Sequence, residues 1–248
     1  TTRQVAGKVL VYDLGGGTFD VTIMNVNGLQ MDIVCSQGDH ALGGIDFDQK
    51  VLEILQKLYR DKFGTELIAS EEDRAKYEDE AEDVKKTLSR RPVAKKILYG
   101  PSGSMRAEVT REMFEEAIAP LVARTDMMVE VALEEAGLKP SDVTTVLLVG
   151  GSTRVPMVRA HLEQTFGFAP ACEVNVDECV ALGAALHAGL TAVRQNPDAV
   201  DTGIRTGLQD ICLTDVCNHS YGTICAPIDK ETGRRVVQNR IILKKNTP

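Results

Sequence analysis

Residues 9–24 read Val9-Leu10-Val11-Tyr12-Asp13-Leu14-Gly15-Gly16-Gly17-Thr18-Phe19-Asp20-Val21-Thr22-Ile23-Met24. Two runs rich in β-branched and aromatic residues flank three consecutive glycines, which predicts a β-hairpin. Glycine lacks Cβ, so successive backbone N–H groups of such a turn can point to one spot and hold a phosphate. Asp13, Thr18 and Asp20 flank the turn, where a hydroxyl suits a phosphate oxygen and carboxylates suit hydrated Mg²⁺. A plain hairpin without a ligand is the alternative.

Composition places the chain among ordinary globular proteins. Its 248 residues suffice for one large domain or two modest ones, and 43% of them are hydrophobic. The net charge of −8 argues against a nucleic-acid surface. The sequence has no apolar run that could span a bilayer and opens on no signal peptide, so we expect a cytoplasmic protein without membrane contact. Its six cysteines are scattered without Cys-x-x-Cys, which is typical of cytosolic thiols.

The segment after the hairpin predicts a third strand over 29–36, a glycine-rich loop over 38–44 and a helix that Asp46 caps and Gly64 ends. A second helix begins at Ser70, with Asp73 in a capping box. One face of this helix carries polar side chains at helical spacing: Glu82, Lys85, Lys86 and Ser89. By pattern alone, a solvated face with Glu–Lys pairs explains them.

The second glycine-rich site follows an apolar strand over 146–149. Gly150-Gly151-Ser152-Thr153-Arg154-Val155-Pro156 leads from that strand into a helix that Gly167 ends. A strand that runs into Gly-Gly and then a helix is a common way to seat a nucleotide against backbone, and Arg154 can lie flat on a base. Close packing of strand and helix is the alternative.

The remaining elements carry no evident chemistry. A small hairpin is expected over 94–99 and 105–109, a long helix over 110–136 and a small-residue helix over 177–190. The stretch 191–208 reads as a linker, and the runs 221–228 and 235–243 read as two strands.

Several motifs together resemble the 70-kilodalton heat-shock chaperone family (DnaK-like). Asp13–Asp20 is similar to the second phosphate motif of that family, and Leu148–Pro156 is similar to its adenosine motif. The resemblance covers about residues 8–189 without a break. Further matching segments are Gly38-Asp39, Leu42–Gly44, Asp46–Asp48, Glu82–Ser89 and Asn175–Glu178.

The resemblance implies an α/β fold of the actin-like ATPase (ribonuclease H-like) type, and within it the second lobe with an inserted smaller subdomain. The implied lobe spans 1–190, its base-proximal subdomain 1–45 and 115–190, and the inserted subdomain 46–114. A linker over 191–216 would lead to a C-terminal β-hairpin over 217–248, the start of a peptide-binding β domain.

The resemblance also implies site roles. Catalysis is expected to involve Asp13, Thr18 and Asp20, with Asp13 holding a metal through water. The phosphates would lie at Gly15, Gly16, Gly17 and Thr18, with Gly44 closing over them. Ribose and adenine would contact Glu82, Lys85, Lys86 and Ser89. Arg154 would stack on the other face of the base, and Asp177 would line the base pocket. The sugar and phosphate would lie over Gly150, Gly151 and Ser152.

Cofactors and partners follow in the same way. The resemblance implies ATP or ADP with Mg²⁺, and K⁺ as the monovalent cation. It implies a J-domain co-chaperone, a nucleotide-exchange factor and unfolded peptides as partners of the intact protein. The first lobe of the family, with its own phosphate loop and a lysine needed for hydrolysis, has no match here, so we expect this chain alone to be inactive. The alternatives are an actin-like small-molecule kinase and a module that self-associates through its C-terminal strands.

Overall fold

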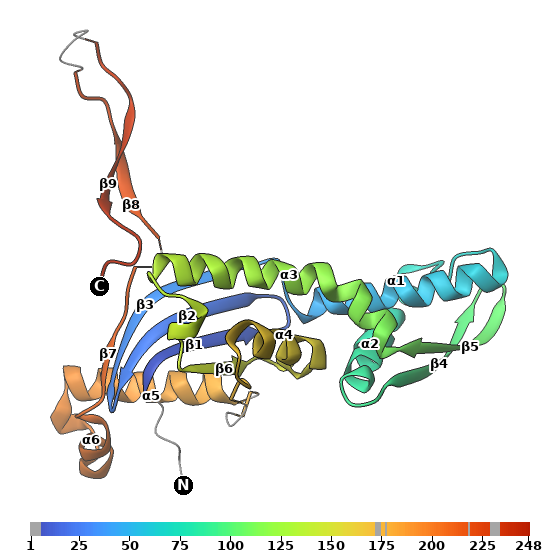
Figure 1. The fold of residues 1–248 in the computed structure, drawn as a ribbon, viewed down its shortest axis with the longest axis horizontal. Helices are drawn as coiled ribbons and strands as arrows, with labels where there is room; N and C mark the ends of the chain where they lie inside the picture. Colours follow the sequence, from blue (N-terminus) through green and yellow to red (C-terminus); the bar gives the residue numbers. More distant parts are fainter. Residues whose placement is uncertain (1–5, 172–174, 177, 218, 229–233) are drawn as a thin grey trace.

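The computed structural model describes residues 6–171, 175–176, 178–217, 219–228 and 234–248. Its centre is a five-stranded sheet in the order β6-β1-β2-β3-β7 (Figure 1). Neighbouring strands β1, β2 and β3 are antiparallel, whereas β6 runs parallel to β1 and β7 parallel to β3. The strands are β1 (Gly7–Leu14), β2 (Phe19–Asn27), β3 (Gln30–Asp39), β6 (Thr145–Val149) and β7 (Cys212–Thr214).

The glycine hairpin forms as predicted. Leu14 pairs with Phe19, and the Gly15 amide donates to the Thr18 carbonyl at 3.0 Å, so the turn holds four residues. The third strand also forms, but it runs on to Asp39 because Gly38 and Asp39 pair with the start of β2. The prediction of a loop at these two positions was therefore wrong.

Helix α3 (Arg111–Glu135) covers one face of the sheet along β2 and β3 (Figure 1). The predicted start of this helix near Thr110 is confirmed, and the Thr110 side chain caps it by accepting from the Met113 amide. The Tyr12 hydroxyl on β1 donates to Thr125 Oγ1 on α3 at 2.7 Å within the buried interface. After α3 come η1 (Pro140–Asp142), β6, η2 (Gly151–Arg154) and α4 (Pro156–Phe166), which ends at Gly167 as predicted.

A second group of elements lies between β3 and α3 in the sequence. It consists of α1 (Gly44–Phe63), α2 (Glu71–Leu88) and the hairpin β4 (Val93–Gly100)–β5 (Gly103–Thr110). The Tyr77 hydroxyl of α2 accepts from the Tyr99 amide and donates to the Tyr99 carbonyl, both at 2.8 Å. One continuous hydrophobic core joins this group to the sheet through α3.

Helix α1 begins earlier than the sequence suggested. Its N-cap is Gly43, and Asp46 lies at the third helical position, where its carboxylate accepts from the Gly43 amide at 2.7 Å. The prediction of Asp46 as the N-cap residue was therefore wrong: it still helps to cap the helix, but from the third helical position. The predicted end at Gly64 (φ 68°) and the start of α2 at Ser70 are confirmed.

The C-terminal part contains helices where the composition suggested irregular structure. Helix α5 (Cys179–Gln195) is followed by η3 (Pro197–Ala199) and α6 (Thr202–Leu208), so the stretch 191–208 is largely helical. Strands β8 (Tyr221–Cys225) and β9 (Gln238–Leu243) form the expected antiparallel hairpin, which projects away from the sheet (Figure 1). Among the described residues, no helix combines the length and apolarity needed to cross a membrane.

Candidate functional site

The start of α1 lies directly on the glycine turn. The Gly44 amide donates to the Gly15 carbonyl at 2.9 Å, and the Ile45 amide donates to the Gly16 carbonyl at 2.7 Å. A Cβ on Gly43 would lie 2.6 Å from the Gly16 carbonyl oxygen, so only glycine fits this contact. With both carbonyls engaged, the exposed residues Gly16, Gly17 and Thr18 form the outer rim of the turn.

The loop η2 reaches the same turn from the other side. Strand β6 runs parallel to β1, with Val149 beside Asp13, so the loop after β6 emerges next to the turn. Gly150 has φ 83°, and a Cβ there would lie 2.3 Å from the Leu14 carbonyl oxygen, which explains the glycine. The Ser152 hydroxyl donates to the Gly15 carbonyl at 2.9 Å. The two glycine-rich bends therefore meet.

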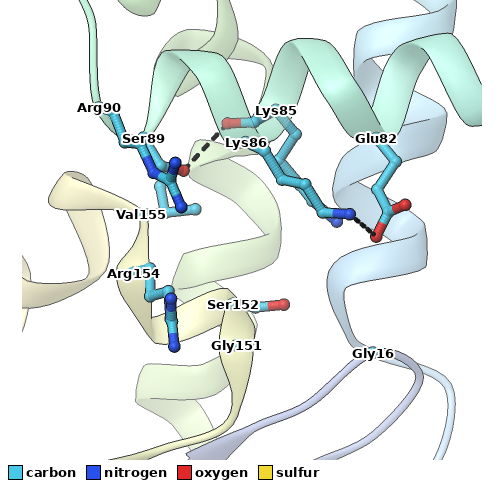
Figure 2. A pocket seen from close by; sticks show the side chains of 10 residues that line it. All are labelled: Gly16, Glu82, Lys85, Lys86, Ser89, Arg90, Gly151, Ser152, Arg154 and Val155. Atoms are coloured by element: carbon cyan, nitrogen blue, oxygen red, sulfur yellow. Dashed lines mark hydrogen bonds and ion pairs between the residues drawn. The ribbon is translucent and has the colours of Figure 1, made fainter. Parts of the chain in front are cut away.

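A cavity of about 410 Å³ opens between these bends and helix α2. Figure 2 shows α2 along one side and Gly16 with η2 along the opposite side. Seven of its lining residues were predicted from the sequence of α2 and η2, and Gly16 was predicted from the glycine turn. Its lining residues are Gly16, Glu82, Lys85, Lys86, Ser89, Arg90, Gly151, Ser152, Arg154 and Val155.

The polar side chains of α2 hold defined positions around this cavity. Lys86 pairs with Glu82 at 3.0 Å one turn earlier, and both are about half exposed. The Ser89 hydroxyl donates to the Lys85 carbonyl at 3.0 Å (Figure 2). Lys85 itself is buried, with 9% of its surface exposed, and its ammonium donates to Asp48 Oδ2 at 2.8 Å and to the Gly44 carbonyl at 3.0 Å.

Sequence reasoning missed three residues of this site. Arg90 and Val155 line the cavity directly after the predicted residues Ser89 and Arg154. Asp48 lies one helical turn after Gly44 on α1, which puts its carboxylate on the same side as the Gly44 carbonyl. The spacing of four residues between Gly44 and Asp48, one helical turn, is the sequence signal that could have identified Asp48.

Other predicted residues lie around the turn and do not line the cavity. Asp13 and Asp20 are direct cross-strand partners at the base of the turn, so they share one face of the sheet. The Asp13 carboxylate lies against Gly150 and the Asp20 carboxylate against Gly38, where added Cβ atoms would meet them. Gly15, Gly17, Thr18, Gly44 and Gly150 build the turn and its two contacts, and Asp177 lies outside the described residues.

The carboxylate pair is electrostatically unfavourable as it stands. Burial, and then the negative charge of Asp20, raises the pKa of Asp13 above its ordinary value. Like charges directly opposite each other destabilise a strand pair. A bound cation would remove this penalty, so the pair fits a cation that it holds directly or through water. Among the described residues, no group of three or more His, Cys, Asp or Glu side chains gathers as a metal site.

Comparison with known proteins agrees with these motifs. The sequence profile of the family described as "Hsp70 protein" matches residues 2–243. The chaperone protein DnaK of Thermosipho melanesiensis is 37% identical over 222 residues, which cover 87% of this chain and 36% of that relative. DnaK of Thermosipho africanus is 39% identical with the same coverage. The mitochondrial-type heat shock protein 70 of Encephalitozoon hellem is 38% identical over 196 residues, which cover 77% of this chain and 33% of the relative.

The chain spans about a third of the length of these curated relatives. The family match, in contrast, extends over nearly the whole chain and includes both glycine-rich bends and helix α2. The mixed α/β architecture agrees with the fold that this family implies. The chain belongs to the Hsp70 protein family.

Proposed function

We propose that this chain is the second lobe of the nucleotide-binding unit of an Hsp70-type chaperone and that it binds an adenine nucleotide. The observation that carries the proposal is the contact of Ser152 with the Gly15 carbonyl, because it makes two distant bends border one cavity with α2. The proposed lobe spans 1–190, with 1–45 and 115–190 as its base-proximal subdomain and 46–114 inserted.

The cavity suits a base and a ribose. Arg154 offers a planar guanidinium that can stack on an aromatic ring, and the α2 side chains lie across the cavity from η2. Glu82 and Ser89 supply hydrogen-bonding groups for ribose hydroxyls and ring nitrogens. Asp177, which lies outside the described residues, is proposed to line the base pocket on the family resemblance of the segment 175–178 alone.

The glycine turn suits the phosphates. Its Gly15 and Gly16 carbonyls are already bonded to α1, which leaves Gly16, Gly17 and Thr18 on the outer rim to face an anion. Asp13 and Asp20 would hold Mg²⁺ through its water, with K⁺ as the neighbouring monovalent ion, because the crowded carboxylates need a cation. Bound Mg²⁺ would supply charge neutralisation of the phosphates.

ATP hydrolysis would belong to a longer protein in which the first lobe completes the clamp on the phosphates. Helix α5 supports this, because Leu182 and Leu186, one helical turn apart on the same face, are 58% and 54% exposed and offer apolar surface to that lobe. In that protein, J-domain co-chaperones, nucleotide-exchange factors and unfolded peptides are the proposed partners. This chain alone is expected to bind without turnover.

Coupling to peptide binding has a physical route in this fold. We propose that 191–216 is the linker and that 217–248 begins the peptide-binding β domain. Strand β7 of the linker pairs with Gln30–Asp32 at the edge of the sheet, and that sheet also ends in the glycine turn. A shift of this sheet edge would therefore move both the linker strand β7 and the glycine turn.

A second candidate function is self-association through the hairpin. Ile224 on β8, Val237 just before β9 and Ile242 on β9 are 77%, 72% and 76% exposed, so the hairpin could pair with a second copy. Light scattering of the purified chain tests this, since a strict monomer contradicts strand exchange. A small-molecule kinase loses support because the chain belongs to the Hsp70 family.

Calorimetry of the 248-residue chain with ADP, with and without Mg²⁺, tests nucleotide binding. We expect binding that Glu82→Ala weakens about tenfold, because the carboxylate lines the cavity. Glu78→Ala is the matched control: it lies on the same helix and also pairs with a cation one turn away, Arg74, at 3.8 Å. Equal affinities of the Glu82 variant and the unmodified chain would contradict the base-pocket assignment.

A further inference from the structure

The two lysines of the proposed site differ in how they are held. Lys86 extends into solvent and pairs with Glu82 on its own helix. Lys85 is buried and reaches across to α1, where its ammonium donates to Asp48 Oδ2 and to the Gly44 carbonyl. An ammonium has three donors, so these two bonds orient the third.

The fixed ammonium lies where the segments of the site converge. A Cβ on Gly44 would lie 3.1 Å from the Lys85 nitrogen, 2.5 Å from Ser152 Oγ and 3.4 Å from the Gly15 carbonyl oxygen. Helix α2, the start of α1, the glycine turn and η2 thus meet around one point. Lys85 lines the cavity, whereas Asp48 does not line it and is linked to it by its ion pair with Lys85.

The surroundings of Asp48 are unfavourable for a purely structural contact. Its side chain is 17% exposed, and Oδ1 is buried without a hydrogen-bond partner among the described residues. Burial raises the pKa of Asp48, while the hydrogen bond from Lys85 and its charge lower it. Two well-packed apolar side chains would join α1 and α2 without this desolvation. A charged pair at this position therefore points to a role in the site.

We propose that Asp48 is a positioning residue that fixes the Lys85 ammonium at the floor of the cavity, so that a bound adenine nucleotide meets a pre-oriented donor. The inference rests on the proposed nucleotide binding. Pre-orientation raises affinity because the side-chain entropy of lysine is lost before the ligand arrives. Without Asp48, Lys85 is expected to leave the Gly44 carbonyl and move with the freedom of Lys86.

Because Asp48 is negatively charged, the two explanations predict opposite changes in nucleotide affinity when it is replaced. Removing a carboxylate close to a nucleotide site strengthens the binding of an anion if only the electrostatic field matters. Loss of positioning has the opposite effect. We expect Asp48→Asn to weaken ADP binding about tenfold, the loss typical of one charge-assisted hydrogen bond. Asp61→Asn, an exposed acid on the same helix, makes the same charge change and should stay within about twofold.

A double-mutant cycle measures whether Asp48 acts through Lys85. Calorimetry with Mg²⁺-ADP compares the unmodified chain with Asp48→Asn, Lys85→Met and the double variant. The expected result is that Asp48→Asn loses nothing further once Lys85 is Met. Labelling with an amine-reactive reagent, read by mass spectrometry without nucleotide, should show Lys85 modified at least about tenfold faster in Asp48→Asn.

The outcomes separate this inference from the proposed function. If the unmodified chain binds no ADP, the proposed function fails and the inference fails with it. If that chain binds ADP and Asp48→Asn binds it equally or more tightly, only the positioning role is overturned. Additive losses in the double variant, or unchanged labelling of Lys85, also overturn it. Loss of binding with non-additivity and faster labelling supports it.

Discussion

The Ser152 hydroxyl donates a hydrogen bond of 2.9 Å to the Gly15 carbonyl oxygen, although the residues lie 137 positions apart in the chain. The same carbonyl accepts from the Gly44 amide at 2.9 Å. One backbone oxygen of the glycine turn thus joins the loop after β6 and the start of α1. Ser152 of this junction also lines the cavity.

Ser152→Ala removes the hydroxyl from this junction. We expect a loss of about 0.5–1.5 kcal/mol in the free energy of unfolding, because Ser152 is 6% exposed and its bond is buried. ADP affinity should fall about threefold to tenfold as η2 gains freedom. Thermal denaturation and calorimetry measure the two effects. Ser104→Ala, at an exposed site on β5, is the control, and an unchanged affinity would show that the junction does not shape the cavity.

Asp13→Asn should stabilise the chain without ligand. The pKa of Asp13 is raised in the folded state, so the folded chain binds its proton more tightly than the unfolded chain does. The resulting stability is present at low pH and is lost as the pH rises through the raised pKa. At pH 7 the variant should therefore melt roughly 2 °C higher than the unmodified chain, and at pH 3 the difference should vanish.

The same variant should lose the effect of Mg²⁺ on ADP binding, since one of the two carboxylates becomes neutral. Asp79→Asn, an exposed position on α2, controls for net charge. Melting curves at several pH values, together with calorimetry with and without Mg²⁺, give the answer. A Mg²⁺ effect that survives in Asp13→Asn would refute the cation role.

Tyr77→Phe should destabilise the hairpin β4–β5. The Tyr77 hydroxyl satisfies both the amide and the carbonyl of Tyr99, and Tyr77 is 1% exposed. Removing it leaves two backbone groups unpaired, at a cost of about 1–3 kcal/mol. Denaturant unfolding measures the loss. The control Tyr221→Phe, on the exposed hairpin β8–β9, should change the free energy of unfolding by less than about 0.5 kcal/mol. Equal effects of the two variants would contradict the stabilising role of the Tyr77 hydroxyl.

Glu135→Gln should loosen the end of the chain from α3. The Glu135 carboxylate accepts from Gln37 Nε2 at 2.7 Å, from Lys245 Nζ at 3.1 Å and from Asn246 Nδ2 at 3.0 Å. Loss of its charge weakens these bonds, so amide hydrogen exchange over 244–247 should accelerate about threefold to tenfold. Glu134→Gln, the exposed neighbour, is the control, and identical exchange in both variants would speak against this attachment.

Local signals fixed the elements that the sequence predicted well. Gly64 and Gly167 end helices because a positive φ suits glycine, and Ser70 and Thr110 begin helices because their hydroxyls accept a backbone N–H. Each signal acts within one or two helical turns. The position of Asp46 misled for a related reason: a capping acid can act from the first turn as well as from the N-cap.

Long-range pairing decided what the sequence missed. Gly38 and Asp39 are strand residues because β2 supplies their partners, and β7 joins the sheet because the free edge of β3 lies open to it. The sequence did not predict the helices within 191–208, because the Gly and Thr residues there are typical of a linker. The motif resemblance named the residues of the site, but no local pattern revealed that Lys85 would be bonded to Asp48.

By itself, then, the sequence determined the glycine hairpin, the polar face of α2 and the glycine-led loop after β6, since periodicity and the conformational freedom of glycine act between near neighbours. Only the tertiary structure decided that Gly15, Gly44 and Ser152 touch and that Lys85 turns toward α1. The physical reason is that strand order and helix packing bring these groups together, and both depend on how the entire core fills its volume.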